Sequence, residues 1–91
     1  MSSDEIEYQR VIWHSRRGML ELDLVLEPFV KKQYPLLDDG QQAAYRALLD
    51  CQDQELYDWF LGKSAPATLQ LQQIVRVVLE YQAGRDLTEL I

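Results

Sequence analysis

The sequence predicts an all-α protein, a compact five-helix bundle that folds as a single domain over residues 1–91. Apolar residues recur at helical spacing in five segments, and residues that start or stop helices bound these segments. No two alternating segments are joined as a hairpin, so a strand would have no partner for its backbone hydrogen bonds. A length of 91 residues with 47% hydrophobic residues fits one small globular domain.

The first helix is expected over residues 3–17. Ser2 and Glu5, three residues apart, have the form of a capping box, in which two side chains satisfy free N–H groups at a helix start. Arg16 and Arg17 would lie in the last turn, where the negative end of the helix dipole favours cations. Local signals therefore bound this helix at both ends.

The second helix is expected over residues 19–34, after Gly18 has ended the first in a left-handed conformation. Leucines in this segment also alternate with other residues, as in a half-buried strand. The absence of a partner strand decides for a helix. Pro28 removes one backbone hydrogen bond and predicts a kink. One face of this helix carries Leu22, Val25, Leu26, Phe29 and Val30.

The third helix is expected over residues 39–50. Asp38 and Gln41 repeat the form of a capping box at its start. Its apolar face would consist of Ala44, Tyr45, Leu48 and Leu49.

The last two helices are expected over residues 54–61 and 67–82. Asp53 would cap the shorter one, and Gly62 would stop it. Residues 85–91 form a tail that the sequence assigns neither to a frayed end nor to a folded-back segment.

Four aromatic side chains, those of Trp13, Tyr45, Trp59 and Phe60, are assigned to the core, because aromatic rings dominate the cores of small domains. An aromatic ring at the edge of the bundle would instead suit a partner protein, and the sequence does not select which one. Cys51 is the only cysteine, which excludes an internal disulfide.

The net charge and the distribution of charged and apolar residues argue against several classes of protein. A formal net charge of −6 argues against nucleic-acid binding, and so against a helix-turn-helix protein. Residues 38–62 hold six acids against one base, which is interpreted as a solvated face. No apolar stretch has the length for membrane insertion, and the acidic N-terminus is unlike a mitochondrial presequence. We expect a soluble, cytoplasmic protein.

Catalysis is not expected. His14 and Cys51, the only histidine and cysteine, are too few for a zinc site, so no metal is expected. Glu21 and Asp23 would lie on different faces of a helix, which makes them a poor acid–base pair. No glycine-rich phosphate loop is present, so no stably bound cofactor is expected.

The segment between the first two helices has the most distinctive charges. Arg17 at a helix C-terminus and Glu21 in the next first turn both suit helix dipoles, and Glu21 could bond free N–H groups. Helix capping alone therefore accounts for Arg17 and Glu21, and no partner protein is needed to explain them. It does not explain Arg16 or Asp23, and an exposed corner with fixed charges would also suit docking. Gly18 would let a partner's backbone approach.

These residues resemble the succinate dehydrogenase assembly factor family SdhE, also called the flavinator family. The resemblance covers roughly residues 8–80. Its first block is Trp13-x-x-Arg16-Arg17-Gly18-Met19-x-Glu21-Leu22-Asp23. Further matches are Pro28-Phe29, Leu48-Leu49-Asp50-Cys51 and Asp53-x-x-Leu56-x-x-Trp59. The resemblance implies a five-helix bundle, in agreement with the periodicity.

The resemblance also implies a function. Such a protein promotes covalent attachment of FAD to a histidine of the flavoprotein subunit of succinate dehydrogenase, and of fumarate reductase. FAD is then the partner's cofactor. The implied partner-binding residues are Arg17, Gly18 and Glu21, with Arg16 and Asp23 at the rim. On this interpretation, replacing Arg17 or Glu21 by alanine weakens docking and leaves thermal unfolding almost unchanged.

A different class of function stays open as an alternative. The chain would then be an antitoxin or a generic adaptor that binds its partner through the acidic face of residues 38–58. Reversing charges on that face would separate the two hypotheses.

Overall fold

The computed structural model describes residues 3–89, and the side chains of residues 5–84. Within this range it contains five α-helices, a 3-10 turn and no strand, which confirms the predicted all-α fold. The helices are α1 (Ser3–His14), α2 (Leu20–Lys32), α3 (Asp39–Leu49), α4 (Asp53–Phe60) and α5 (Leu69–Glu89), and the 3-10 turn η1 (Tyr34–Leu36) follows α2.

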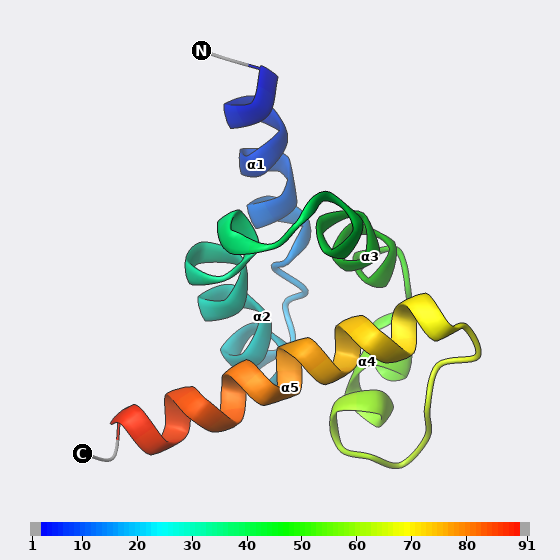
Figure 1. Cartoon of the computed structure of the whole chain (residues 1–91). Coiled ribbons are helices and arrows are strands. Elements are labelled where there is room, and N and C mark those ends of the chain that lie inside the picture. Colours follow the sequence, from blue (N-terminus) through cyan, green and yellow to red (C-terminus); the bar gives the residue numbers. More distant parts are fainter. Residues whose placement is uncertain (1–2, 90–91) are drawn as a thin grey trace.

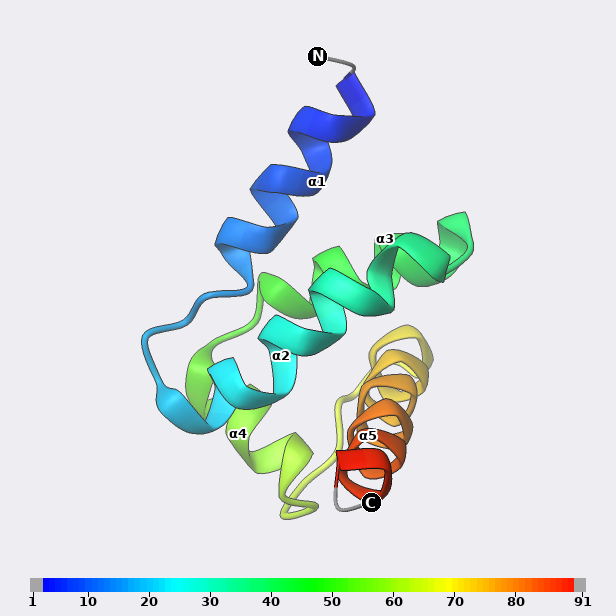
Figure 2. The same ribbon diagram turned by 90° about the vertical axis from the view of Figure 1, so that its left-hand side faces the viewer.

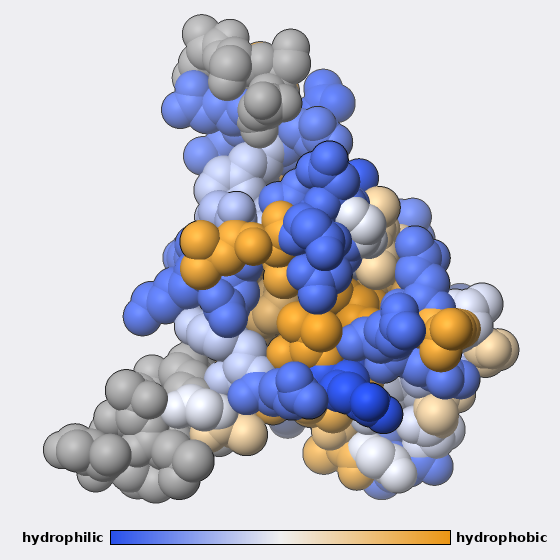
Figure 3. Space-filling model, in the orientation of Figure 1, coloured by the Kyte–Doolittle hydropathy of each residue, from blue (hydrophilic) through white to orange (hydrophobic). Residues whose placement is uncertain are grey.

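Helix α5 runs across the bundle and packs against α2, α3 and α4 (Figure 1). Helix α1 packs on α2, and its N-terminal half projects away from the other helices (Figures 1 and 2). Apolar side chains gather at the seam between α3 and α5, with polar side chains around them (Figure 3). None of the described helices combines the length and the apolar character needed to cross a bilayer.

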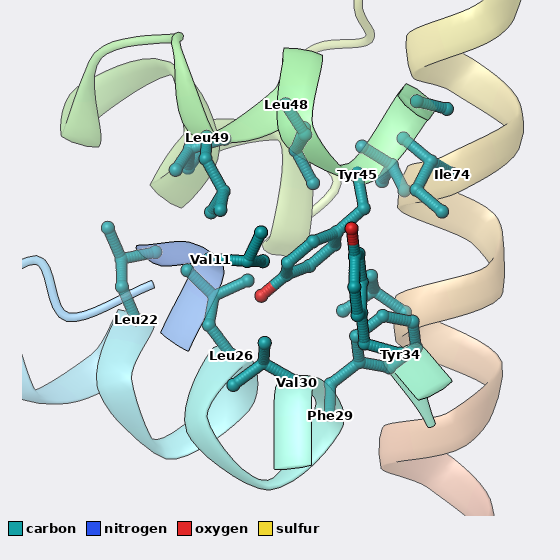
Figure 4. Packing of buried hydrophobic residues seen from close by; sticks show 14 of the residues in the cluster. Val11, Leu22, Leu26, Phe29, Val30, Tyr34, Tyr45, Leu48, Leu49 and Ile74 are labelled. Atoms are coloured by element: carbon teal, nitrogen blue, oxygen red, sulfur yellow. The ribbon is translucent and has the colours of Figure 1, made fainter. Parts of the chain in front are cut away.

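The core draws on all five helices and on η1 (Figure 4). Its centre is an aromatic cluster in which the ring of Tyr45 lies 5.2 Å from Phe29 and 5.5 Å from Tyr34, centroid to centroid. The hydroxyl of Tyr45 is 2.8 Å from Ser15 Oγ, which in turn donates to the Val11 carbonyl at 2.9 Å. This pairing satisfies two polar groups that burial would otherwise leave without partners.

Two predicted helix boundaries are confirmed. Asp38 accepts from the Gln41 amide at 2.7 Å, and the Asp38 amide donates to the Gln41 side chain at 3.4 Å, as in a capping box. Gly62 is left-handed (φ +75°). The next amide, of Lys63, bonds back to the Asp58 carbonyl at 2.9 Å, as in a Schellman stop.

The expected end of the first helix is wrong by about one turn. Helix α1 ends at His14, and residues 15–19 form a linker to α2. The Arg17 amide donates to the Asp23 carboxylate at 2.8 Å, so it is unavailable to continue the helical ladder. Gly18 is left-handed as predicted (φ +79°), but it lies inside the linker. Ser2, the expected cap of this helix, lies outside the described residues.

The starts of the last two helices also differ from expectation. Asp53 does not cap α4 but is its first residue, and Gln52 occupies the cap position with its amide bonded to the Glu55 carboxylate at 3.1 Å. Helix α5 starts at Leu69, and the Thr68 hydroxyl accepts the Leu71 amide at 3.3 Å. The side chain that caps α5 was therefore not identified from the sequence.

Helix α5 continues through Gly84 to Glu89, beyond the predicted end at residue 82. A helical glycine costs about 1 kcal/mol relative to alanine, and no proline follows Gly84 to enforce a stop. Residues 85–89 of the predicted tail are thus helical, and residues 90–91 lie outside the described part.

Helix α2 contains the predicted apolar face, with Pro28 inside one continuous helix. Tyr45 and Trp59 are buried and Phe60 is half-buried, as expected, but the assignment of Trp13 to the core is wrong, because its side chain is 69% exposed. Val11 in α1 and Ser15, the first residue after it, are buried, and Trp13, two residues from each, points to the other side.

Candidate functional site

The linker between α1 and α2 lies at the edge of the molecule (Figure 2). Ser15 is buried, Arg17 and Met19 are half-buried, and Arg16 and Gly18 are exposed. A β-carbon added to Gly18 would meet no atom within 4 Å. Space is therefore available there, and it is the left-handed backbone that favours glycine.

The Arg17 side chain points into the protein and is only 12% exposed. Its Nε donates to the Asp53 carboxylate at 2.7 Å. Its Nη1 donates to the carbonyls of Leu49 (2.7 Å) and His14 (3.2 Å), and Nη2 donates to the Cys51 carbonyl at 2.7 Å. One guanidinium thus joins the linker to the end of α1, the end of α3 and the start of α4.

The charges around Arg17 suit this position. His14 and Leu49 are the last residues of α1 and α3, and helix C-termini favour a cation. Asp53 is the first residue of α4, where the positive end of the dipole favours a carboxylate. The prediction that Arg17 caps a helix end is confirmed, and the structure adds that it does so for α3 as well as α1.

Asp23, in the first turn of α2, holds the backbone of Arg17 through the 2.8 Å bond from its amide. Arg17 is thus fixed by Asp53 through its side chain and by Asp23 through its main chain. We call Arg17, Asp23 and Asp53, with the carbonyls of His14, Leu49 and Cys51, the Arg17 clamp.

Arg16 and Glu21 differ from Arg17 in facing solvent. The Arg16 guanidinium lies over the Trp13 ring, 5.5 Å from its centroid, a cation–π arrangement. The expected bond from Glu21 to free N–H groups is absent, since within the described residues its carboxylate makes no hydrogen bond or ion pair. Asp23, two residues further on, accepts the linker amide of Arg17 instead of a free N–H group of α2. The five residues singled out from the sequence therefore divide into exposed Arg16, Gly18 and Glu21 and inward-bonded Arg17 and Asp23.

Large apolar side chains extend the exposed part of the site. Trp13 at the end of α1 is 69% exposed, and Leu20 and Leu24, one turn apart on α2, are 68% and 56% exposed. The bond from Lys31 to Glu27, also on α2, lowers the pKa of Glu27, and the positive charge of Arg16 adds to this effect. We call the surface of Trp13, Arg16, Gly18, Leu20, Glu21 and Leu24 the corner face.

Other reactive groups do not form a second site in the described structure. No three side chains of His, Cys, Asp or Glu come together there as a metal would require. Cys51 is half-buried, and its Sγ points to the Ala47 carbonyl at 3.7 Å. Burial, and then the nearby Glu55 and Asp50, raise the pKa of the Cys51 thiol, which keeps it protonated at neutral pH.

Asp53 is the residue that sequence reasoning placed in the wrong role. It lies 36 positions from Arg17, and no local spacing relates the two. Its place in the Asp-x-x-Leu-x-x-Trp block was visible, but the block alone does not reveal a contact with the linker.

Comparisons with known proteins agree on one family. A family model described as "Flavinator of succinate dehydrogenase" matches residues 9–82. The FAD assembly factor SdhE of Pseudomonas aeruginosa is 49% identical over 78 residues, 86% of this chain and 93% of that protein. The protein of that name from Yersinia pseudotuberculosis is 36% identical over 84% of this chain and 86% of its own. The solution structure of a UPF0350 protein superposes with a TM-score of 0.72 at 32% identity, covering 93% of this chain and 89% of that one.

Proposed function

The chain belongs to the family of flavinators of succinate dehydrogenase, and from this premise we propose that it promotes covalent attachment of FAD to the flavoprotein subunit of that enzyme. We extend the proposal to the flavoprotein of fumarate reductase. FAD is then handled as the partner's cofactor and is not held stably by this chain. We propose a reducing cytoplasm as its location, consistent with the free thiol of Cys51.

The observation that carries the proposal is the corner face. It combines a left-handed glycine with a cation and an anion, Arg16 and Glu21, that have no ion-pair partner within the described residues. Exposed charged groups without an ion-pair partner favour proteins with complementary charge. Arg16 suits a carboxylate or carbonyl of the flavoprotein, and Glu21 suits N–H donors or a cation. Gly18 removes the side chain that would keep the partner's backbone at a distance.

Exposed apolar side chains supply the rest of the proposed interface. Tryptophan and arginine are the residue types that most often dominate binding energy, and Trp13 and Arg16 are stacked on each other. Leu20 and Leu24 continue the apolar surface along α2. Burial of these groups against the flavoprotein would provide affinity, and the charged groups would fix the orientation.

The chemistry in this proposal belongs to the flavoprotein and its flavin. By binding one conformation of that subunit more tightly than others, the corner face would increase the population in which the target histidine and the flavin are in attack geometry. No residue of this chain is assigned a catalytic role. Of the five proposed partner-binding residues, Arg16, Gly18 and Glu21 would contact the flavoprotein, and Arg17 and Asp23 would support the contact.

The test is covalent flavin on the flavoprotein subunit, measured by in-gel fluorescence in a strain that lacks this protein. Covalent flavin is expected to fall sharply in that strain and to return when the intact gene is restored. Normal covalent flavin in the deletion strain would refute the proposed function.

Docking is tested with a matched pair of variants. Leu20 and Leu69 are exposed to the same degree, 68% and 67%, but only Leu20 lies on the corner face. Leu20→Ala should weaken binding of the purified flavoprotein subunit, and Leu69→Ala should not. Trp13→Ala should weaken it about tenfold or more, because an exposed tryptophan is a typical hot spot. Equal binding by Leu20→Ala and Leu69→Ala would place the interface elsewhere.

A further inference from the structure

We propose that Arg17 is a positioning residue that holds the corner face in its binding shape from the inside, with Asp53 as a required part of the site. The inference rests on the proposed function and assigns the two arginines of the linker different tasks. Arg16 contacts the flavoprotein, and Arg17 contacts only its own chain.

The hydrogen bonds of Arg17 support this assignment. A guanidinium has five N–H groups, and the side chain makes four hydrogen bonds, all to groups of this chain. With 12% of the side chain exposed, little of it is left for a partner. Direct docking through Arg17 would require breaking bonds that join α1, α3 and α4.

The linker has few other restraints. Between buried Ser15 and half-buried Met19, exposed Arg16 contacts Trp13, through a 3.1 Å bond from its amide to the Trp13 carbonyl and through the Trp13 ring. These contacts are local and do not tie the linker to α3 or α4, and exposed Gly18 has no core contact. Gly18 is also the residue with the widest choice of backbone conformations. The Arg17 clamp anchors the middle of this segment, because Asp23 bonds its amide and Asp53 its guanidinium.

Breaking the clamp therefore releases the segment that carries Arg16 and Gly18 without touching its exposed side chains. The released linker samples many shapes, of which one fits the partner. The apparent affinity then equals the intrinsic affinity multiplied by the fraction of molecules that remain in the binding shape. This relation gives the proposal a quantitative form.

The test uses three variants of the full chain. Arg17→Lys keeps the charge but cannot supply the planar fork, so it should not restore the clamp. Asp53→Ala removes the carboxylate, and Asp53→Asn keeps an acceptor and should have a milder effect. Asp50→Asn is the control, since it removes the same charge from an exposed neighbour that makes no clamp contact. Circular dichroism and thermal unfolding establish that each variant is folded at the assay temperature.

Two quantities are compared for each variant. The first is the closed fraction, meaning the fraction of free molecules whose linker has its wild-type shape. It is obtained from the chemical shift of the Gly18 amide, which should lie between the wild-type value (fully closed) and the random-coil value (fully open). The second is the Kd for the flavoprotein subunit. Charge-assisted bonds of this kind correspond to about tenfold to a hundredfold changes in an equilibrium. For Arg17→Lys and Asp53→Ala we expect Kd to rise by the reciprocal of the closed fraction, with no change for Asp50→Asn.

A weakened Kd with a linker that stays closed would overturn the inference, because it would mean that Arg17 or Asp53 contacts the partner directly. An open linker with unchanged Kd would also overturn it. Failure of the proposed function is a separate result, since Trp13→Ala and Leu20→Ala would then retain full binding.

Discussion

Replacing the two adjacent arginines by alanine, one at a time, should have very different consequences for stability. Arg17→Ala removes an ion pair to Asp53 and three bonds to backbone carbonyls. Arg16→Ala removes an exposed side chain whose structural contact is the ring of Trp13. The sequence suggested that Arg17→Ala would leave unfolding almost unchanged, and the hydrogen bonds of Arg17 reverse that expectation.

The magnitude follows from those bonds. A hydrogen bond that involves a charged group contributes about 1.5–3 kcal/mol, but bonds made by one side chain are not additive. Asp53 is 43% exposed, so water can solvate its carboxylate after the change. We therefore expect Arg17→Ala to lower the free energy of unfolding by about 2–3 kcal/mol, which for a domain of this size lowers Tm by about 10–20 °C. Arg16→Ala should cost less than about 0.5 kcal/mol.

Thermal and urea unfolding followed by circular dichroism measure both variants. The dependence of the free energy of unfolding on urea concentration, the m-value, should stay unchanged. An unchanged m-value means that the surface exposed on unfolding is the same and that only the stability has altered. Equal Tm values for the two variants would refute the structural role of Arg17. The same preparations should show that Arg16→Ala loses affinity for the flavoprotein while remaining as stable as the parent.

Further changes test other parts of the site and the fold. Glu21→Ala should weaken docking with no change in Tm, and a loss of Tm would assign Glu21 a structural role instead. Gly18→Ala should cost about 1 kcal/mol through its left-handed backbone, as measured by urea unfolding, and an unchanged midpoint would mean that the linker relaxes. Burial raises the pKa of Tyr45 in the folded protein above its usual value near 10, which it keeps in the unfolded chain. The unfolded chain therefore ionises first as the pH rises. The stability that Tyr45 contributes is full below about pH 10 and is lost as the pH rises toward the folded-state pKa. Tyr45→Phe should cost about 1 kcal/mol at neutral pH and reduce this alkaline loss, and identical pH profiles for the two proteins would contradict the assignment. Reversing the charges of Asp39 and Asp50 to lysine should leave docking intact, and loss of the partner would favour an adaptor that uses the acidic face.

Elements that depend on neighbouring residues were predictable from the sequence. The helical face of α2, the capping box of Asp38 and Gln41, and the glycine stop at Gly62 are all set within a few positions, and all three appear in the structure. The family motif also located the corner that carries the exposed charges. Local spacing was sufficient because each signal acts within one or two helical turns.

Features that depend on distant parts of the chain were not predictable. The direction of the Arg17 side chain is set by Asp53, 36 positions away. The end of α1 was also missed, although Asp23 is only six positions from the Arg17 amide that it binds, because a bond across a linker follows no helical spacing. Trp13 looked like a core residue because its type favours burial, but the position of α1 at the edge of the bundle leaves it exposed. Such outcomes require the relative placement of helices, which periodicity does not give.

The position of the Arg17 clamp has a consequence for the order of folding. Its bonds reach from the linker to the α3–α4 junction, so the linker acquires its final shape only after those two helices have formed and met. Contacts this far apart in the chain carry a loop-closure cost that local helices do not. An incompletely folded or truncated chain that lacks α3 and α4 would therefore lack the ordered linker, and under the proposed function the flavoprotein would bind only fully folded molecules.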